Sequence, residues 1–229
     1  MINLSLHKKN LTSILKFLYN DAITRNSLGF KGGTAAMLFY DLPRMSVDLD
    51  FDLLNKEKED EIFTHLQKKL SRFGKIEESH KKRFTLFFLI NYQKGQRKTK
   101  IEISRRESYS QFETKNYLGI PMSVMVSEDM MANKLTALID RRYPAARDCF
   151  DVWYLLSQHW EINFELIKKR LQLTPEETLT KAINLVEKQD KSFFLQGLGE
   201  LIDENRKPWV RDHLRKELLF ELRLARETL

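Results

Sequence analysis

The fold is decided by two stretches of the chain, Phe30-Lys31-Gly32-Gly33-Thr34 and Arg44-Met45-Ser46-Val47-Asp48-Leu49-Asp50-Phe51-Asp52. The first begins in a short apolar segment and leads into residues typical of a helix, so its glycine pair predicts a turn between a strand and a helix. The second alternates polar and apolar residues from Ser46 to Leu54, as a half-buried strand does. Together they predict a sheet with a helix beside it.

The acids of the second stretch are spaced for one face of a strand. Side chains two residues apart on a strand point the same way, so Asp48, Asp50 and Asp52 share a face. Carboxylates lined up in this way repel each other unless a cation lies between them. Mg²⁺ accepts carboxylate oxygens and leaves positions for phosphate oxygens. The alternative is an exposed strand whose outer face is merely acidic.

The glycine pair adds a possible phosphate site. Gly32 and Gly33 let backbone N–H groups approach a phosphate closely, and the start of a helix favours negative charge. The hydroxyl of Thr34 can supply another donor. Arg44 and Ser46 lie on the acids' face if the strand begins that early, and either could contact phosphate. Arg44 could instead only offset the acidic charge.

Outside these stretches the chain divides by its patterns into two halves. An amphipathic helix is predicted around residues 11–18 and another over 56–72. Strands are predicted at 75–79, 83–92 and 99–104, with one or two more in 114–126. From Ser127 to Leu229 there are four or five helical patterns, broken near Pro144, Pro175 and Pro208. Ser127, followed by two acids, is predicted to cap the first of them. We therefore expect an α+β domain over 1–126 and a helical domain over 127–229.

Composition limits the partners and the compartment. The 229 residues carry a net charge of +7 and give a pI of about 9.3, which favours a polyanion such as nucleic acid. The single cysteine, Cys149, excludes an internal disulfide framework and a multi-cysteine zinc site. No apolar run approaches the roughly 18 residues that span a bilayer, and the N-terminus does not read as a secretory signal. We expect a cytoplasmic protein without a membrane partner.

The glycine pair, the helix and the two acids one residue apart resemble the first motif of the DNA polymerase β-like nucleotidyltransferase superfamily. More narrowly, the two stretches resemble AbiEii/AbiGii-type abortive-infection toxins. Lys100-Ile101-Glu102-Ile103 looks like that family's strand with the third carboxylate. Its helical motif resembles the segments Lys134–Leu138, Arg141, Arg147-Asp148 and Asp151-Val152-Trp153. The resemblance covers roughly residues 30–156.

The resemblance implies a fold and a set of site residues. It implies a polymerase β-like nucleotidyltransferase domain, a mixed sheet with flanking helices, followed by a helical bundle that contributes Lys134, Arg147 and Asp148 to the active site. Mg²⁺ or Mn²⁺ would be held by Asp48, Asp50 and Glu102. Glu102 would also help to deprotonate the attacking hydroxyl. The nucleotide phosphates would be bound by Gly32, Gly33, Thr34, Ser46, Lys134, Arg141 and Arg147.

Several roles stay open at this stage. Lys134 would neutralise the triphosphate as pyrophosphate leaves. Asp148 could orient Lys134 or touch the nucleotide. Arg147 and Asp151 are four residues apart and could simply pair on their helix. Gly33 stands where many superfamily members have a serine, and Glu102 where many have an aspartate.

The implied function is metal-dependent transfer of a nucleoside monophosphate from a nucleoside triphosphate to an acceptor. The resemblance implies the toxin of a type IV-like toxin–antitoxin or abortive-infection (phage defence) system, with a cognate antitoxin as partner. The basic charge favours RNA as acceptor, and the family points to the 3′ end of tRNA. The alternatives are a protein or small-molecule hydroxyl as acceptor, or a catalytically silent nucleic-acid-binding module.

Overall fold

The computed structural model describes residues 3–229, which form two compact units. Unit 1 contains residues 3–41 together with Met45–Met125. Unit 2 contains Leu42–Arg44 and Val126–Leu229. The three residues Leu42–Arg44 leave the first unit after one helix and return to it just before the acidic strand, so the chain passes between the units three times.

Unit 1 is built on a mixed seven-stranded sheet with the strand order β3-β4-β5-β2-β1-β7-β6. Strands β2 and β5 are parallel, as are β1 and β7, and the other neighbours are antiparallel. The strands are β1 Leu28–Lys31, β2 Asp48–Leu53, β3 Lys75–Lys81, β4 Thr85–Asn91, β5 Thr99–Ser104, β6 Phe112–Tyr117 and β7 Ile120–Met125. The acidic strand is therefore central.

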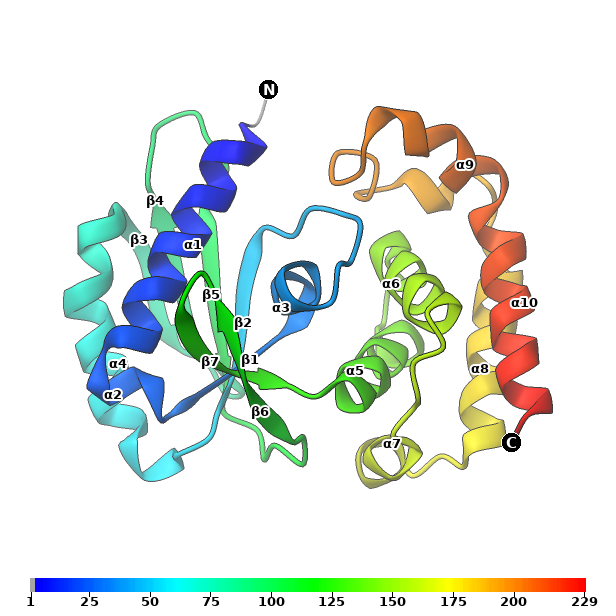
Figure 1. Cartoon of the computed structure of the whole chain (residues 1–229), viewed down its shortest axis with the longest axis horizontal. Helices are drawn as coiled ribbons and strands as arrows, with labels where there is room; N and C mark the ends of the chain where they lie inside the picture. The colour runs from blue at the N-terminus through cyan, green and yellow to red at the C-terminus, as the bar shows by residue number, and fades with distance from the viewer. Residues whose placement is uncertain (1–2) are drawn as a thin grey trace. The chain divides into compact units, whose positions relative to one another are not determined.

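One face of this sheet is apolar and is covered by helices (Figure 1). Phe30 on β1 contacts Phe39 at the end of α3, and Phe88 on β4 contacts Phe63 on α4. From α1, the Tyr19 hydroxyl donates to backbone carbonyls of β1 and β7. The helical segments of the unit are α1 Leu4–Asn20, α2 Ala22–Arg25, α3 Gly32–Phe39, η1 Lys56–Lys58, α4 Glu59–Lys69 and η2 Leu70–Phe73. Burial of the apolar face leaves the polar residues of the central strands on the other face.

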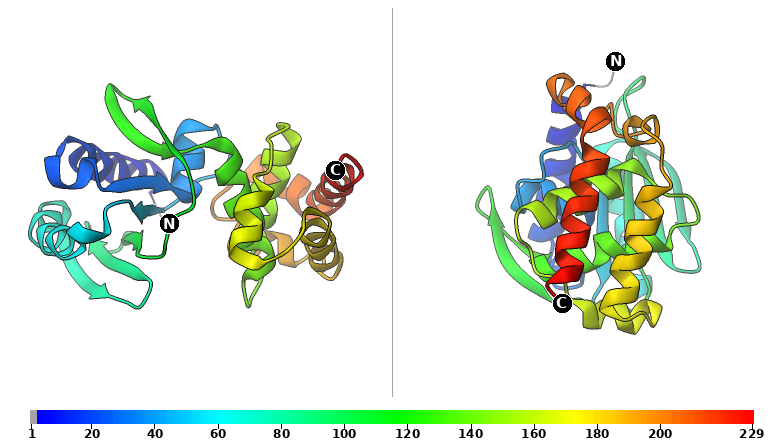
Figure 2. Two further views of the ribbon diagram at one scale, coloured as in Figure 1. Left: turned by 90° about the horizontal axis from the view of Figure 1, so that it is seen from below. Right: turned by 90° about the vertical axis from the view of Figure 1, so that its right-hand side faces the viewer.

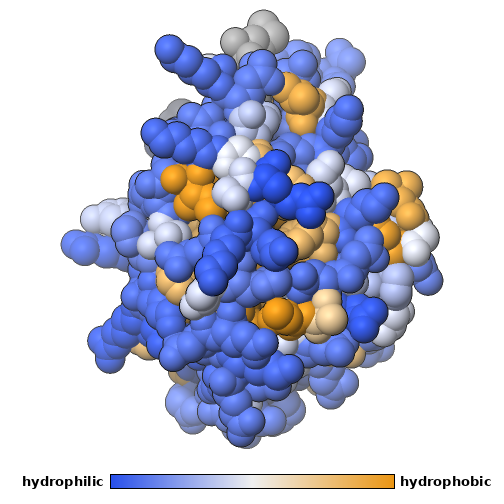
Figure 3. All heavy atoms as spheres, turned by 90° about the vertical axis from the view of Figure 1, so that its left-hand side faces the viewer, coloured by the Kyte–Doolittle hydropathy of each residue, from blue (hydrophilic) through white to orange (hydrophobic). Residues whose placement is uncertain are grey.

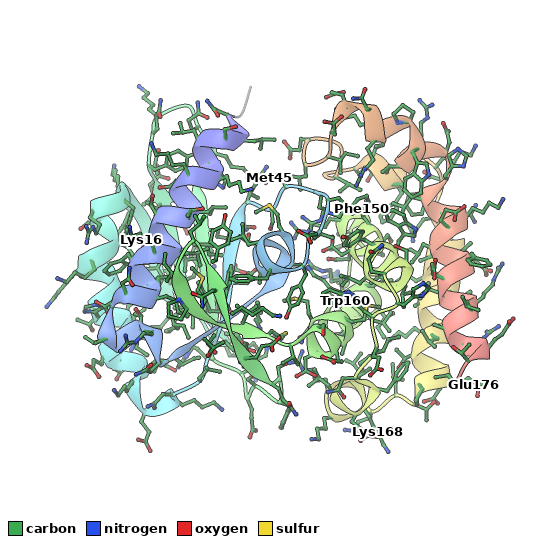
Figure 4. The ribbon with its side chains drawn as sticks, viewed as in Figure 1. Lys16, Met45, Phe150, Trp160, Lys168 and Glu176 are labelled. Carbon is green, nitrogen blue, oxygen red and sulfur yellow. The ribbon has the colours of Figure 1, made fainter. Side chains whose placement is uncertain are left out.

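The regular elements described in unit 2 are all helices. Its elements are α5 Ser127–Asp140, α6 Ala146–Ser157, α7 Phe164–Leu171, α8 Pro175–Glu187, η3 Phe193–Leu195, η4 Glu204–Arg206, α9 Lys207–Asp212 and α10 Leu214–Glu227. Helices α8 and α10 lie side by side (Figure 2). Phe150 on α6, labelled in Figure 4, is completely buried in the core of this unit. Thr174 and Glu177 form a capping box that starts α8, with Pro175 in its first turn.

The predicted strands agree with the structure except at some of their ends, whereas the four or five helical patterns expected after Ser127 are six α-helices and two short 3-10 helices in residues 127–229. Strand β5 has the predicted bounds, whereas β2 begins at Asp48 and not at Ser46. The predicted N-cap is wrong by one residue: Ser127 is the first residue of α5, Val126 occupies the cap, and the Ser127 hydroxyl donates to Glu128. The predicted break near Pro208 is found, because α9 begins there with Pro208 in its first turn, where no N–H is needed.

Among residues 3–229, no helix is long and apolar enough to cross a bilayer. On the face drawn in Figure 3, hydrophilic side chains predominate and hydrophobic ones are scattered. Scattered apolar side chains are normal on a protein surface and need no partner.

Candidate active site

The polar face of the sheet brings the predicted acids together. Asp50 lies opposite Glu102 in the parallel register of β2 and β5, and Lys31 lies opposite Asp50 on the other side. Residues paired across strands point to the same face. Asp48, two residues before Asp50, shares that face. Two neighbouring strands, about 4.8 Å apart, therefore carry the three carboxylates predicted to act together.

These three carboxylates differ in their surroundings. The Nζ of Lys100 lies 3.5 Å from a carboxylate oxygen of Asp48, whose side chain is 23% exposed. Glu102 is half-buried, and within residues 3–229 its carboxylate has neither a hydrogen bond nor an ion pair. Because a carboxylate without a partner costs little only when solvent or a ligand reaches it, Glu102 is available to bind one.

The third acid of β2 has a different role. Asp52 is buried, with Lys31 Nζ 2.5 Å from one of its oxygens. The hydroxyl of Ser108 donates to its other oxygen at 2.7 Å. Both oxygens of Asp52 are thus engaged by the protein itself, so this acid stabilises the sheet and the loop after β5.

The glycine turn passes directly over Asp50. Gly32 has φ +80°, and a Cβ atom at this position would lie 2.9 Å from the Cβ of Asp50 and closer still to its carboxylate. Only glycine combines a left-handed backbone with so close an approach. The N-terminus of α3, which starts at Gly32, therefore lies beside an acid of the predicted metal site.

Thr34 and Ser46 are held by the protein. The Thr34 hydroxyl donates to the Asp48 carbonyl at 2.5 Å, and the side chain is completely buried. The hydroxyl therefore fastens the turn to the acidic strand, while a direct phosphate contact through it is not seen. Ser46 is also buried, before the start of β2, and its N–H approaches the sulfur of Met37.

In unit 2, Asp151 is the centre of a buried ion cluster. Arg44 binds it with two hydrogen bonds, Nε to Oδ1 at 2.5 Å and Nη2 to Oδ2 at 2.6 Å. Lys134 Nζ lies 2.7 Å from Oδ2. Burial alone would raise the pKa of Asp151, but the two cations outweigh it and hold that pKa below its usual value. We call Arg44, Lys134 and Asp151 the buried ion cluster.

This cluster changes two expectations. Arg147 and Asp151, which could have paired on their helix, do not pair there, because Asp151 binds Arg44 and Lys134 instead. Arg44 lies outside β2 and is not on the face of the acids. Arg147 is half-buried, and no ion pair involves it in the described part of the chain.

Asp148 is the second buried acid of α6. Burial raises its pKa, and the neighbouring cations only partly oppose that rise. The Nε of Arg141 lies 2.7 Å from Oδ2, close enough for an ion pair, although this oxygen accepts no hydrogen bond of good geometry. A buried, incompletely satisfied carboxylate with a perturbed pKa is typical of functional sites.

The carboxylates of unit 1 fit a divalent cation. Within residues 3–229 no group of three His, Cys, Asp or Glu side chains is close enough to enclose a metal ion by itself. Mg²⁺, however, is commonly held by one or two carboxylates and completed by substrate phosphates and water. Asp48 and Asp50 supply two carboxylates, with Glu102 beside them and the Gly32 turn against Asp50.

The comparison with protein families identifies the chain. A family model described as "Nucleotidyl transferase AbiEii toxin, Type IV TA system" matches residues 16–221. The chain belongs to this family. It is a nucleotidyltransferase toxin of the type IV toxin–antitoxin class, which confirms the resemblance seen in the motifs. No curated protein matches its sequence.

Solved structures share the fold of this AbiEii-family toxin. A candidate nucleotidyltransferase from H. pylori has a TM-score of 0.62 at 21% identity, covering 97% of this chain and 94% of that one. JHP933 from Helicobacter pylori has a TM-score of 0.62 at 20% identity, with 99% and 93% covered. An antigenic nucleotidyltransferase-like protein from Paracoccidioides brasiliensis has a TM-score of 0.50 at 16% identity, with 85% and 94% covered.

One residue near the toxin's acids gives no signal in the sequence. His7 on α1 is buried, with Nε2 2.8 Å from the carbonyl of Val47 and Nδ1 3.0 Å from the Tyr92 hydroxyl. Because a carbonyl only accepts, Nε2 carries the proton. Burial lowers the pKa of His7, which favours the neutral ring. His7 thus fixes the backbone of Val47, the residue before Asp48. No local sequence pattern predicts this role.

Proposed function

We propose that this toxin transfers a nucleoside monophosphate from a nucleoside triphosphate to a hydroxyl of RNA, with the 3′ end of tRNA as the favoured acceptor. The observation that supports this most directly is the packing of the Gly32 turn against Asp50, which lies in register with Glu102. A helix N-terminus and a pair of carboxylates in contact are suited to bind a nucleotide phosphate and its divalent cation together.

The side chains of unit 1 take distinct roles in this proposal. Asp48 and Asp50 would hold Mg²⁺ or Mn²⁺, which when bound offsets phosphate charge and aligns the reacting groups. Glu102, whose carboxylate is unpaired within the described residues, accepts the proton of the attacking hydroxyl. The acceptor oxygen bonds to the α-phosphorus, the bond from that phosphorus to the leaving oxygen breaks, and pyrophosphate departs.

The charged groups of unit 2 are proposed to serve the nucleotide. Lys134, Arg141 and Arg147 would neutralise the triphosphate and the departing pyrophosphate. Asp148 would orient these cations, because it already lies against Arg141. Asp151 has a positioning role, since it fixes the ammonium of Lys134 and is itself completely buried.

Charge supports RNA as the acceptor. The net charge of +7 favours a polyanion over a neutral small molecule. By its family the toxin also has an antitoxin as partner, and in a host cell the transfer would serve abortive infection. An acceptor hydroxyl on a protein or a small molecule uses the same chemistry, so the nature of the labelled product decides between them.

The test is label transfer with matched variants. The purified toxin is incubated with each α-labelled NTP, Mg²⁺ and total RNA, and the products are analysed with and without RNase. Asp48→Asn and Asp50→Asn should abolish labelling, whereas Asp60→Asn, an exposed acid paired with Lys81, should not. Label that survives RNase shows another acceptor, and labelling that persists in both strand variants contradicts the proposed site.

A further inference from the structure

A cluster of cations and aromatic rings lies where β3 turns into β4. Its members, which we call the basic-aromatic patch, are Lys82, Arg83, Phe84, Phe87 and Arg106. The turn is fixed by the Lys82 N–H, which donates to the Thr85 carbonyl at 2.8 Å. The segment after β5 is joined to it by the Arg105 N–H, which donates to the Phe84 carbonyl at 2.9 Å. The patch is therefore held on the sheet of unit 1.

Three cations lie close to the two aromatic rings of the patch. Phe84 is 43% exposed, and the guanidinium carbons of Arg83 and Arg106 lie 4.8 and 4.6 Å from its ring centre. Lys82 Nζ lies 3.6 Å from the ring centre of Phe87. All three are within the range of a cation–π contact. Three cations gathered around two rings give this surface a local positive charge, which favours an anion.

Two other cations beside the patch form ion pairs with acids of the protein. Lys81 pairs with Asp60, and Arg105 pairs with Glu59. By contrast, no acid pairs with Lys82, Arg83 or Arg106 anywhere in residues 3–229. The chain thus supplies acids to two of the five cations in this region and leaves the other three for something outside the protein.

The patch includes a residue that lies in line, across the strands, with two acids of the candidate active site. Phe87 lies opposite Glu102 in the register of β4 and β5, and Glu102 lies opposite Asp50. Phe87 therefore shares the polar face with both acids and is one strand spacing, about 4.8 Å, from the strand of Glu102. The patch therefore adjoins the carboxylate that is proposed to accept the acceptor's proton.

We propose that the basic-aromatic patch binds a single strand of RNA, the acceptor strand that leads to the reacting hydroxyl. Phosphates contact the three unpaired cations, and a base stacks on the exposed ring of Phe84. Proteins that bind single strands combine cations along the backbone with aromatic platforms for the bases in this way. The role as acceptor site rests on the proposed function, whereas RNA binding by the patch does not.

Binding is measured without catalysis. The full chain carrying Asp50→Asn, without NTP, is titrated into a fluorescently labelled single-stranded RNA, and anisotropy is followed at several salt concentrations. Phe84→Leu should weaken binding by about 5- to 150-fold, the loss expected for one stacked base. Arg83→Gln with Arg106→Gln should reduce the slope of log affinity against log salt by about 1.4, the loss of two phosphate contacts.

The control removes the same charge elsewhere. Lys68→Gln with Lys69→Gln neutralises two exposed lysines in the last turn of α4, a helix on the apolar side of the sheet. It should weaken binding far less than the arginine pair. Equal weakening by both pairs, or unchanged binding in Phe84→Leu, overturns the patch as the RNA site.

The same variants separate the patch from the proposed function. In the background with an intact Asp50, label transfer to RNA that survives all patch substitutions overturns the patch and leaves the proposed function standing. Patch-dependent RNA binding without label transfer under any condition supports the patch and contradicts the proposed function. Circular dichroism of each variant checks that the fold is retained.

Discussion

The buried ion cluster of unit 2 permits a quantitative prediction. In Asp151→Asn the side chain keeps its shape but loses its charge. Arg44 and Lys134, whose side chains are only 4% and 11% exposed, then lose the buried carboxylate that they share. Breaking a buried pair by removing one partner costs about 3–5 kcal/mol, because the remaining charge is neither solvated nor compensated. We expect unit 2 to lose that much stability.

The tryptophans allow unit 2 to be observed by itself. Trp153, Trp160 and Trp209 are the three tryptophans of the chain and all belong to unit 2. Urea unfolding followed by tryptophan fluorescence therefore reports on this unit. With a urea slope of about 2 kcal/mol/M, a loss of about 3–5 kcal/mol lowers the midpoint by about 1.5–2.5 M.

Two comparisons test the reasoning. Arg44→Met leaves Asp151 paired with Lys134 and should lower the midpoint less than Asp151→Asn does. Asp212→Asn removes another acid that binds an arginine, Arg211, but at an exposed position, and should leave the midpoint unchanged because exposed pairs contribute little. A shift in Asp151→Asn as small as that in Asp212→Asn would refute the account of the cluster.

Four further predictions concern the sites. Gly32→Ala should abolish label transfer. Gly95→Ala, at a glycine with a similar φ of +81° and open space around it, should only lower the free energy of unfolding, by about 1–2 kcal/mol in thermal unfolding, because of its strained backbone. Thr34→Val, which loses the bond to the Asp48 carbonyl, should lower transfer but leave RNA anisotropy titrations unchanged. The pKa of Asp148 is raised by burial, so wild-type stability is full below the unfolded value near 3.8 and falls as pH rises through the folded pKa; urea midpoints of Asp148→Asn should lack that fall. The pKa of His7 is lowered by burial, so stability is full above the unfolded value near 6.5 and declines as pH falls toward the folded pKa; circular dichroism unfolding of His7→Gln should lack that decline.

Much of unit 1 could be predicted because local pattern and tertiary environment agree there. Strand β2 alternates acids with apolar residues, and the apolar ones are those that face the helices of the unit. The glycine turn was predictable for the same reason, since a backbone with positive φ at Gly32 has few alternatives to glycine. The ends of elements were less predictable, as the caps of α5 and the late start of β2 show, because the last residues of an element depend on what packs against them.

The residue pattern alone predicted most of the strands and helices along the chain, the face shared by Asp48, Asp50 and Asp52, and the family. The partners of these acids depend on the fold: Asp52 binds Lys31 and Ser108, although its place in the alternation is the same as that of Asp48 and Asp50. Likewise, Asp151 does not pair with Arg147, one helical turn away. It binds Arg44, which is 107 residues away along the sequence. An exposed ion pair on one helix contributes only a few tenths of a kcal/mol to stability. A buried carboxylate, in contrast, needs a cation to offset the cost of its buried charge. That cation is whichever one the fold buries beside it.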